Sequence, residues 1–257
     1  MSAAAKTGRM LILTSHSIID TFVIIVILLL FAFGCYAVWD SGQIHNAAHS
    51  ARYERFKPTQ ENSGATFEEL QAINPEVIAW LTVYGTNIDY PVTQGTDNMK
   101  YVNTNAEGRH SLSGAIFLDY RNSPHFTDFN SIFYGHHMEN NVMFGEITSF
   151  SNEDFFKDHR YGSLFADGKT HGIEFFAFVH ADANDTQVFR PNITNPEAQQ
   201  RYLDTLMEMA VIVRDDVNIT TQDRIVLLST CSPNETSRRD ILVGRIINYV
   251  PDDPFSL

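Results

Sequence analysis

The stretch RIVLLSTCSPNETSRRDILVGRI, residues 224–246, decides the expected fold of the C-terminal part of the chain. Two apolar runs rich in branched side chains flank a polar segment, 232–237. This pattern is typical of two β-strands joined by a loop. Cys231 ends the first run, and Arg238 and Arg239 begin the second. We therefore expect a strand pair whose loop end brings a guanidinium opposite a thiol.

The region before this pair is also dominated by strand patterns. Apolar runs interrupted by turn residues predict strands within 80–93, 114–121, 130–137 and 172–181. One clear helix interrupts the later strands: it begins at Asn195-Pro196, followed by apolar residues at helical spacing. Strands and helices do not alternate regularly. The sequence therefore predicts a mainly β fold, a closed or partly closed antiparallel-rich barrel with helices packed outside.

The N-terminal region differs from the rest. Residues 21–39 contain no charge and are long enough to cross a bilayer as a helix. Lys6 and Arg9 precede this run and Asp40 follows it, which predicts a cytoplasmic N-terminus and an external C-terminal part. A cleaved signal peptide would have a shorter apolar core and a better cleavage site. Lipid attachment at Cys35 lacks the expected preceding leucine, so we favour an uncleaved anchor.

These features divide the chain into four expected parts. Residues 1–20 form a cytoplasmic N-terminus, 21–39 a transmembrane anchor and 40–62 a helical stalk. Residues 63–257 form the folded domain, and 44% of the whole chain is hydrophobic, which suits a sizeable core. The net charge of −13 and the lack of a basic patch argue against nucleic acid as a partner.

The two cysteines have different expected surroundings. Cys35 lies in the apolar run, which leaves Cys231 as the single thiol of the exported part. An unpaired cysteine in an exported domain suggests a reactive thiol. The alternative is an inert, buried cysteine that packs as a small apolar residue. The position of Cys231 at a strand end, before a polar loop, favours reactivity.

A reactive thiol requires a base and a group that stabilises an oxyanion. His136 follows the apolar run in SIFYGHHM, and His137 should face the opposite side because side chains alternate along a strand. Arg239 is a suitable oxyanion donor because its charge is permanent. The histidine pair could instead bind zinc, but no third ligand has a telling spacing. We therefore expect no metal and no cofactor.

Together the motifs YGHHM, LLSTCS and RRDILVGRI resemble the sortases, and class B sortases in particular. NMKYV, GAIFLDYRN and the helix at 195–211 extend the resemblance to residues 66–250. The resemblance implies a closed barrel of about eight strands with N-terminal helices, an uncleaved anchor and a catalytic domain over 63–257. One departure is Leu227, where threonine is common in the family.

The resemblance also implies roles for individual residues. Cys231 matches the nucleophile, His136 the general acid/base and Arg239 the active-site arginine, with Arg238 as a less well matched alternative. Ser229 and Thr230 would line the substrate groove. Asn98 and Val102 would contact the substrate peptide.

The implied function is that of a membrane-anchored cysteine transpeptidase. Such an enzyme cleaves the C-terminal sorting signal of a surface protein at a threonine carbonyl and forms a thioester. It then transfers the protein to an amine of a peptidoglycan precursor or of a pilin lysine. A papain-like protease would place its cysteine before its histidine, which does not fit this sequence, and an L,D-transpeptidase would carry a Ser-x-Gly-Cys motif, which this sequence lacks. A non-catalytic surface scaffold or adhesion domain with a buried Cys231 stays open as an alternative, and so does a wall enzyme of the L,D-transpeptidase type, which also places its histidine before its cysteine.

Overall fold

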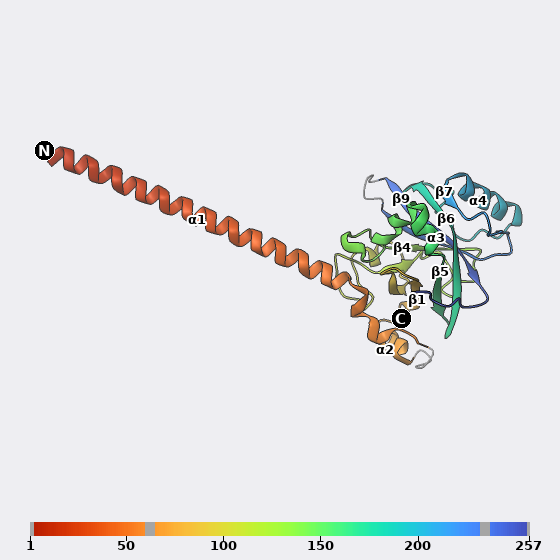
Figure 1. Ribbon diagram of the computed structural model, residues 1–257. Helices are drawn as coiled ribbons and strands as arrows, with labels where there is room; N and C mark the ends of the chain where they lie inside the picture. Colours follow the sequence, from red (N-terminus) through yellow and green to blue (C-terminus); the bar gives the residue numbers. More distant parts are fainter. Residues whose placement is uncertain (1–2, 60–64, 232–236, 256–257) are drawn as a thin grey trace. The chain divides into compact units, whose positions relative to one another are not determined.

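The computed structural model describes residues 3–59, 65–231 and 237–255. The chain separates into two compact units, Met1–Asn46 and Ala47–Leu257. The first unit consists of helix α1 (Ala3–Ala48), drawn in red to orange in Figure 1. Its segment Ile19–Gln43 has a hydropathy of 2.8 and is exposed throughout. This helix is therefore long and apolar enough to cross a membrane.

The second unit is a β-barrel. Its strands are β1 (Val77–Val83), β2 (Asp89–Thr93), β3 (Ile116–Leu118), β4 (Asn130–Tyr134), β5 (Tyr161–Ala166), β6 (Lys169–Asp182), β7 (Ala210–Val213), β8 (Ile225–Cys231) and β9 (Arg238–Ile247). The strand order is β5-β1-β2-β3-β4-β8-β9-β6-β7, and pairing of β5 with β6 closes the ring. β7 extends the sheet beside β6, which leaves eight strands in the ring. The predicted closed, mainly β barrel of about eight strands is confirmed.

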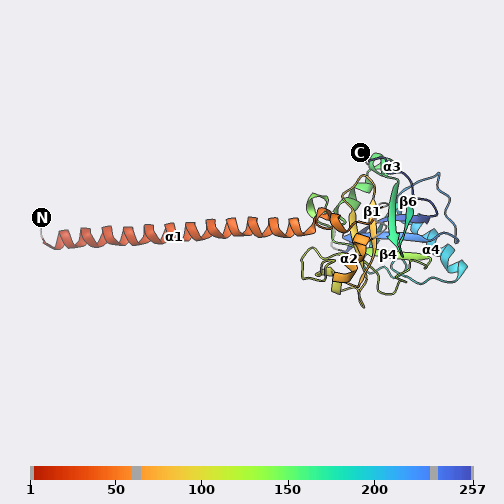
Figure 2. The same ribbon diagram turned by 90° about the horizontal axis from the view of Figure 1, so that it is seen from below.

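Short helices surround the barrel: α2 (Ala65–Ile73), α3 (Glu153–Asp158), α4 (Pro196–Glu208) and the 3-10 turns η1 (Ser50–Arg52), η2 (Glu54–Phe56), η3 (Lys100–Val102), η4 (Glu139–Asn141) and η5 (Gly145–Ser151). Helix α4 lies between β6 and β7 in the chain; it contacts β7 and shares a buried cluster with residues of β6, on the side of the barrel away from α2 (Figure 2). Asn195 caps it by accepting a hydrogen bond from the backbone nitrogen of Ala198, as asparagine does at helix N-termini. The predicted helix between later strands is confirmed.

Two parallel strand pairs interrupt an otherwise antiparallel ring, β2 with β3 and β4 with β8. In the second pair Tyr134 lies opposite Ser229. Parallel strands end at the same edge of a sheet. The residues that follow β4, including His136, therefore lie beside the end of β8.

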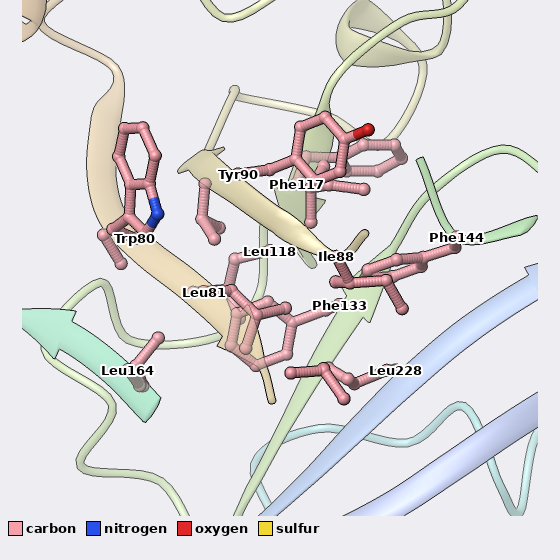
Figure 3. Close-up of a cluster of buried hydrophobic side chains, with 14 of the residues drawn as sticks. Trp80, Leu81, Ile88, Tyr90, Phe117, Leu118, Phe133, Phe144, Leu164 and Leu228 are labelled. Carbon is pink, nitrogen blue, oxygen red and sulfur yellow. The ribbon is translucent and has the colours of Figure 1, made fainter. Parts of the chain in front are cut away.

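The β8–β9 pair has two faces with different surroundings. Leu228 and Leu242 point into the barrel interior, where Leu228 lies with Phe133 and Leu81 (Figure 3). We call this the interior face. Leu227 and Val243 point to the other side and belong to the same cluster as residues of α4; we call this the α4 face. Burying each of these side chains contributes about 1.5–3 kcal/mol to folding.

The register extends these faces to the strand ends. Cys231 pairs with Arg239, and Thr230 pairs with Asp240. Because side chains alternate along a strand, Arg239 lies on the α4 face and Asp240 on the interior face. Simple alternation along β9 thus puts the side chains of Arg239 and Asp240 on opposite faces of the strand pair.

Candidate active site

A pocket of about 460 Å³ lies at the edge where β4 and β8 end. It contains all of the predicted site side chains that the structure describes: His136, Arg239, Ser229, Thr230, Asn98 and Val102. The remaining wall residues are Met99, Phe117, Tyr134, Gly135, Ala183 and Phe189. Residues distant in sequence therefore converge on one hollow.

Cys231 is placed by its backbone. It is the last residue of β8 and pairs with Arg239 of β9, directly after the pocket residue Thr230. The side chain of Cys231 lies outside the described part of the structure. The predicted nucleophile thus stands next to the pocket in the chain, and the position of its sulfur is not described.

The imidazole of His136 is held by the backbone of the η3 turn. Its Nε2 lies 2.8 Å from the carbonyl oxygen of Val102. A carbonyl only accepts, so Nε2 donates in this contact. Gly135 makes this position possible, because a Cβ there would lie 2.5 Å from Ile116 Cδ1 and 2.7 Å from Phe144 Cδ2. The chain can therefore pass close to the barrel wall just before the histidine.

His137 lies outside the pocket. Its Nδ1 is 3.4 Å from the hydroxyl of Thr148 in η5. The two neighbouring histidines have different environments, and His136 is the one that faces the pocket, as its position after β4 predicted. Among the residues that the structure describes, no group of three or more potential ligands could hold a metal ion.

The structure distinguishes the two neighbouring arginines by their surroundings. Arg239 lines the pocket. Arg238 places its Nε 3.5 Å from Oδ1 of the buried Asp240, on the interior face. Only the guanidinium of Arg239 therefore lies where it could reach a bound peptide.

Ser229 and Thr230 form the pocket floor beside Cys231. They are 1% and 2% exposed, and their hydroxyl oxygens make no hydrogen bond within the described ranges. A buried polar group without a partner costs about 1–3 kcal/mol. A peptide that supplies donors or acceptors to these hydroxyls would recover part of that cost.

Asn98 has a fixed orientation at the opposite wall. Its side-chain oxygen accepts from the backbone nitrogen of Tyr120 at 3.0 Å, and its Nδ2 donates to Asp119 Oδ2 at 2.9 Å. One N–H of the amide is left for a further bond. Both this residue and Val102, which the family resemblance suggested as peptide contacts, line the pocket.

The sequence reasoning missed the aromatic walls. Tyr134 could have been found, because it ends β4 two residues before His136 and alternation places both on one face. Phe189 carries no such signal, since it lies in the irregular segment between β6 and α4. Burial above all, and the nearby charge of Asp119, raise the pKa of Tyr134, so its phenol stays protonated. Aromatic walls and few charges suit a peptide with uncharged side chains.

Comparisons with known proteins agree with this geometry. The sortase domain model matches residues 81–247. Sortase B of Staphylococcus aureus is 30% identical over 87% of this chain and 93% of its own. The chain therefore belongs to the sortase family.

Several solved structures that resemble this chain are class B sortases. The crystal structure of sortase B from the Type II pilus of Streptococcus pneumoniae is 45% identical, with a TM-score of 0.63, over 71% of this chain and 99% of that one. A Streptococcus pyogenes class B sortase involved in pilus biogenesis is 41% identical, with a TM-score of 0.65, over 72% and 99%. The chain is thus a class B sortase-type cysteine transpeptidase.

Proposed function

We propose that the pocket binds the C-terminal sorting signal of a surface protein and that Cys231, His136 and Arg239 carry out its transpeptidation. The observation that carries this proposal is the convergence of His136 and Arg239 in one pocket, at the strand end that Cys231 occupies. A scaffold domain would have no reason to bring an imidazole and a guanidinium together in a hollow at the strand end that a cysteine occupies.

The chemistry uses each group once in each half-reaction. The Cys231 thiolate attacks a threonine carbonyl, and Arg239 stabilises the oxyanion that forms. His136 then gives a proton to the departing amine, which leaves a thioester on the sulfur. An incoming amine attacks this thioester, His136 accepts its proton, and the thiolate is restored. The peptide bond that is cleaved is replaced by an amide bond to the acceptor.

The substrate contacts follow from the walls. Ser229 and Thr230 would bond the peptide backbone with their buried hydroxyls, and Asn98 would donate its remaining N–H to a peptide carbonyl. Val102 would contact an apolar peptide side chain while its carbonyl holds His136. His136 must turn away from that carbonyl, or use Nδ1, to reach the leaving amine.

We infer that the acceptor is a lysine amine of a pilin subunit. The supporting observation is the degree of identity: the two streptococcal sortases whose titles name a pilus are 45% and 41% identical to this chain. The S. aureus sortase B is 30% identical. The alternative acceptor is a peptidoglycan precursor, and the acyl-enzyme experiment described below compares it with the pilin lysine.

The apolar helix α1 and its flanking charges support a proposed cellular arrangement. Lys6 and Arg9 precede the span, which favours a cytoplasmic N-terminus and a barrel outside the membrane. Substrate tails and acceptors both reach the outer membrane surface. The domain boundaries proposed for this arrangement are 1–20, 21–39, 40–62 and 63–257.

Trapping of the acyl-enzyme tests the function. The protein is incubated with threonine-containing sorting-signal peptides, and mass spectrometry reports a thioester on Cys231 that is missing in Cys231→Ala. A pilin peptide that contains the lysine or a wall-precursor peptide is then added in separate reactions. We expect the sorting peptide to be transferred to the lysine of the pilin peptide. A thiol that neither forms a thioester nor reacts with an alkylating reagent in the folded protein would favour the scaffold alternative.

A further inference from the structure

An ion pair between the buried carboxylate of Asp119 and the partly exposed guanidinium of Arg121 is bonded to residues of the pocket wall. Asp119 follows β3 and is 0% exposed. Arg121 donates to both of its carboxylate oxygens, from Nε to Oδ1 at 2.9 Å and from Nη2 to Oδ2 at 2.8 Å. The backbone nitrogen of Arg121 also donates to Oδ1 at 3.0 Å. Arg121 thus binds this buried carboxylate through two side-chain hydrogen bonds. Such paired, charge-assisted hydrogen bonds are among the stronger interactions in proteins.

The same carboxylate holds two residues of the pocket wall. Asn98, from the segment after β2, donates to Oδ2 at 2.9 Å. Tyr134, the last residue of β4, donates its hydroxyl to Oδ2 at 3.1 Å. Asp119 itself does not line the pocket. It therefore contacts the site only through the residues that it orients.

The arginine of the pair holds a third wall. Nη2 of Arg121 donates to the carbonyl oxygen of Phe189 at 3.2 Å, and Asn192 donates its side-chain amide to the carbonyl oxygen of Arg121 at 2.7 Å. Both partners lie in the segment between β6 and α4. Two bonds thus tie this irregular segment to the loop after β3.

We propose that the Asp119–Arg121 pair is a positioning device that holds three separately built walls of the pocket at the spacing the substrate peptide requires. The proposal rests on the proposed function and adds to it a residue pair outside the pocket lining. Asn98, Tyr134 and Phe189 come from three elements that are distant in sequence. The pair is the group to which all three are bonded.

The charge state of Asp119 suits this role. Burial opposes its ionisation, but the hydrogen bonds from Arg121 and Asn98 outweigh burial and hold its pKa below the ordinary value. The carboxylate is therefore ionised, with acceptors only, at neutral pH. Its hydrogen bonds therefore all come from donors: Arg121 on one side and the wall residues Asn98 and Tyr134 on the other.

The matched control is a second buried acid with arginine partners. Glu174 on β6 is 4% exposed and accepts from Arg160 and from Arg245. It does not line the pocket. Glu174→Gln therefore removes a comparable buried charge without touching the pocket walls.

The experiment measures KM and kcat for the sorting peptide together with the melting temperature. We expect Asp119→Asn to raise KM about tenfold, the size of one charge-assisted hydrogen bond, with a much smaller change in kcat. Arg121→Lys keeps the charge but loses the two-pronged geometry, and should give an intermediate rise in KM in a folded protein. Glu174→Gln should lower the melting temperature and leave KM unchanged. An equal rise of KM in Glu174→Gln would overturn the proposal.

A double-mutant cycle tests whether Asp119 acts through the walls. In the background Asn98→Ala with Tyr134→Phe, the effect of Asp119→Asn on KM should fall to less than about threefold, because its partners are already gone. An undiminished tenfold effect in that background would overturn the positioning role.

A readout without substrate separates this inference from the proposed function. In the wild-type protein the side-chain amide of Asn98 should give an NMR signal with one slowly exchanging proton, which Asp119→Asn should convert to fast exchange. An unchanged signal would reject the positioning role. Failure of both the wild type and Glu174→Gln to acylate Cys231 would reject the proposed function instead.

Discussion

The two neighbouring arginines Arg238 and Arg239 show how one strand serves two purposes. Arg239 lines the pocket opposite the backbone of Cys231, whereas Arg238 lies beside the buried Asp240 at the mouth of the barrel. The same chemical group lines the pocket at one position and lies beside a buried carboxylate at the next. The difference follows only from the alternation of side chains along β9.

The same division runs along β8. Leu228 packs in the barrel interior with no exposed surface, while Ser229, also buried, lines the pocket. Substitutions on the interior face should therefore change stability, and substitutions at the pocket should change activity. The following measurements test how sharply the two faces are separated.

The largest expected effect is that of Cys231→Ala. Removal of the nucleophile should lower peptide cleavage by about 10⁴-fold or more, because the residual groups cannot form the thioester. The melting temperature should change by only a few degrees. Cleavage is followed by liquid chromatography of a fluorogenic sorting peptide. Cleavage by this variant at even a tenth of the wild-type rate would remove Cys231 from the mechanism.

The second effect compares the arginines directly. Arg239→Gln should lower kcat about 10²–10³-fold, the usual cost of losing one oxyanion donor. Arg238→Gln should keep most of the activity but lower stability, because it removes one of the charged neighbours of the buried Asp240. Steady-state kinetics and thermal unfolding are measured on both. If Arg238→Gln proves the more damaging to kcat, the assignment of the two faces is reversed.

These two comparisons also mark what the sequence could predict. The strand pair, the helix at Pro196–Glu208 and the position of His136 after β4 follow from local patterns of apolar, cap and turn residues. The family resemblance favoured Arg239 over Arg238, but local patterns alone could not decide between the two. The decision depends on the register of β9 with β8, which the polar loop joining the two strands leaves open. The pocket contains both Asn98 and Val102, which the family resemblance suggested.

The Asp119–Arg121 pair lay beyond the sequence reasoning. A carboxylate directly after an apolar run, with arginine two residues later, is a visible local pattern in FLDYRN. Its partners Tyr134 and Phe189 are distant in sequence, however, and nothing local indicates that they meet. Tertiary convergence of this kind is decided by the parallel pairing of β4 with β8 and by the segment before α4.

The third effect tests stability on the two faces of β8. Leu228→Ala should cost about 2–5 kcal/mol in the free energy of unfolding, because it leaves a cavity in the barrel. Ser229→Ala should cost less than about 0.5 kcal/mol, since its buried hydroxyl has no partner to lose among the described residues. Urea unfolding monitored by fluorescence compares them. A cost for Ser229→Ala equal to that for Leu228→Ala would show that the faces are not separate in energy.

The smallest effect is a dependence of stability on pH. The pKa of Asp119 is lowered in the folded protein, so its contribution is complete above the ordinary value of 3.8 and is lost as the pH falls through the folded value. The difference in unfolding free energy between the wild type and Asp119→Asn should therefore shrink as the pH falls below 3.8. Urea titrations between pH 3 and about pH 7 measure this convergence. If the unfolding free energies of the two proteins changed with pH in parallel, protonation of Asp119 would not be coupled to unfolding.

The parallel pairing of β4 with β8 has a consequence for biosynthesis. His136 leaves the ribosome long before Cys231, and the two can meet only when the C-terminal strands have been inserted into the ring. Barrels built on such long-range pairings fold on the order of milliseconds to seconds, far more slowly than helical bundles. A chain whose C-terminal strands have not yet joined the ring therefore has no assembled pocket, because His136 and the end of β8 are still apart.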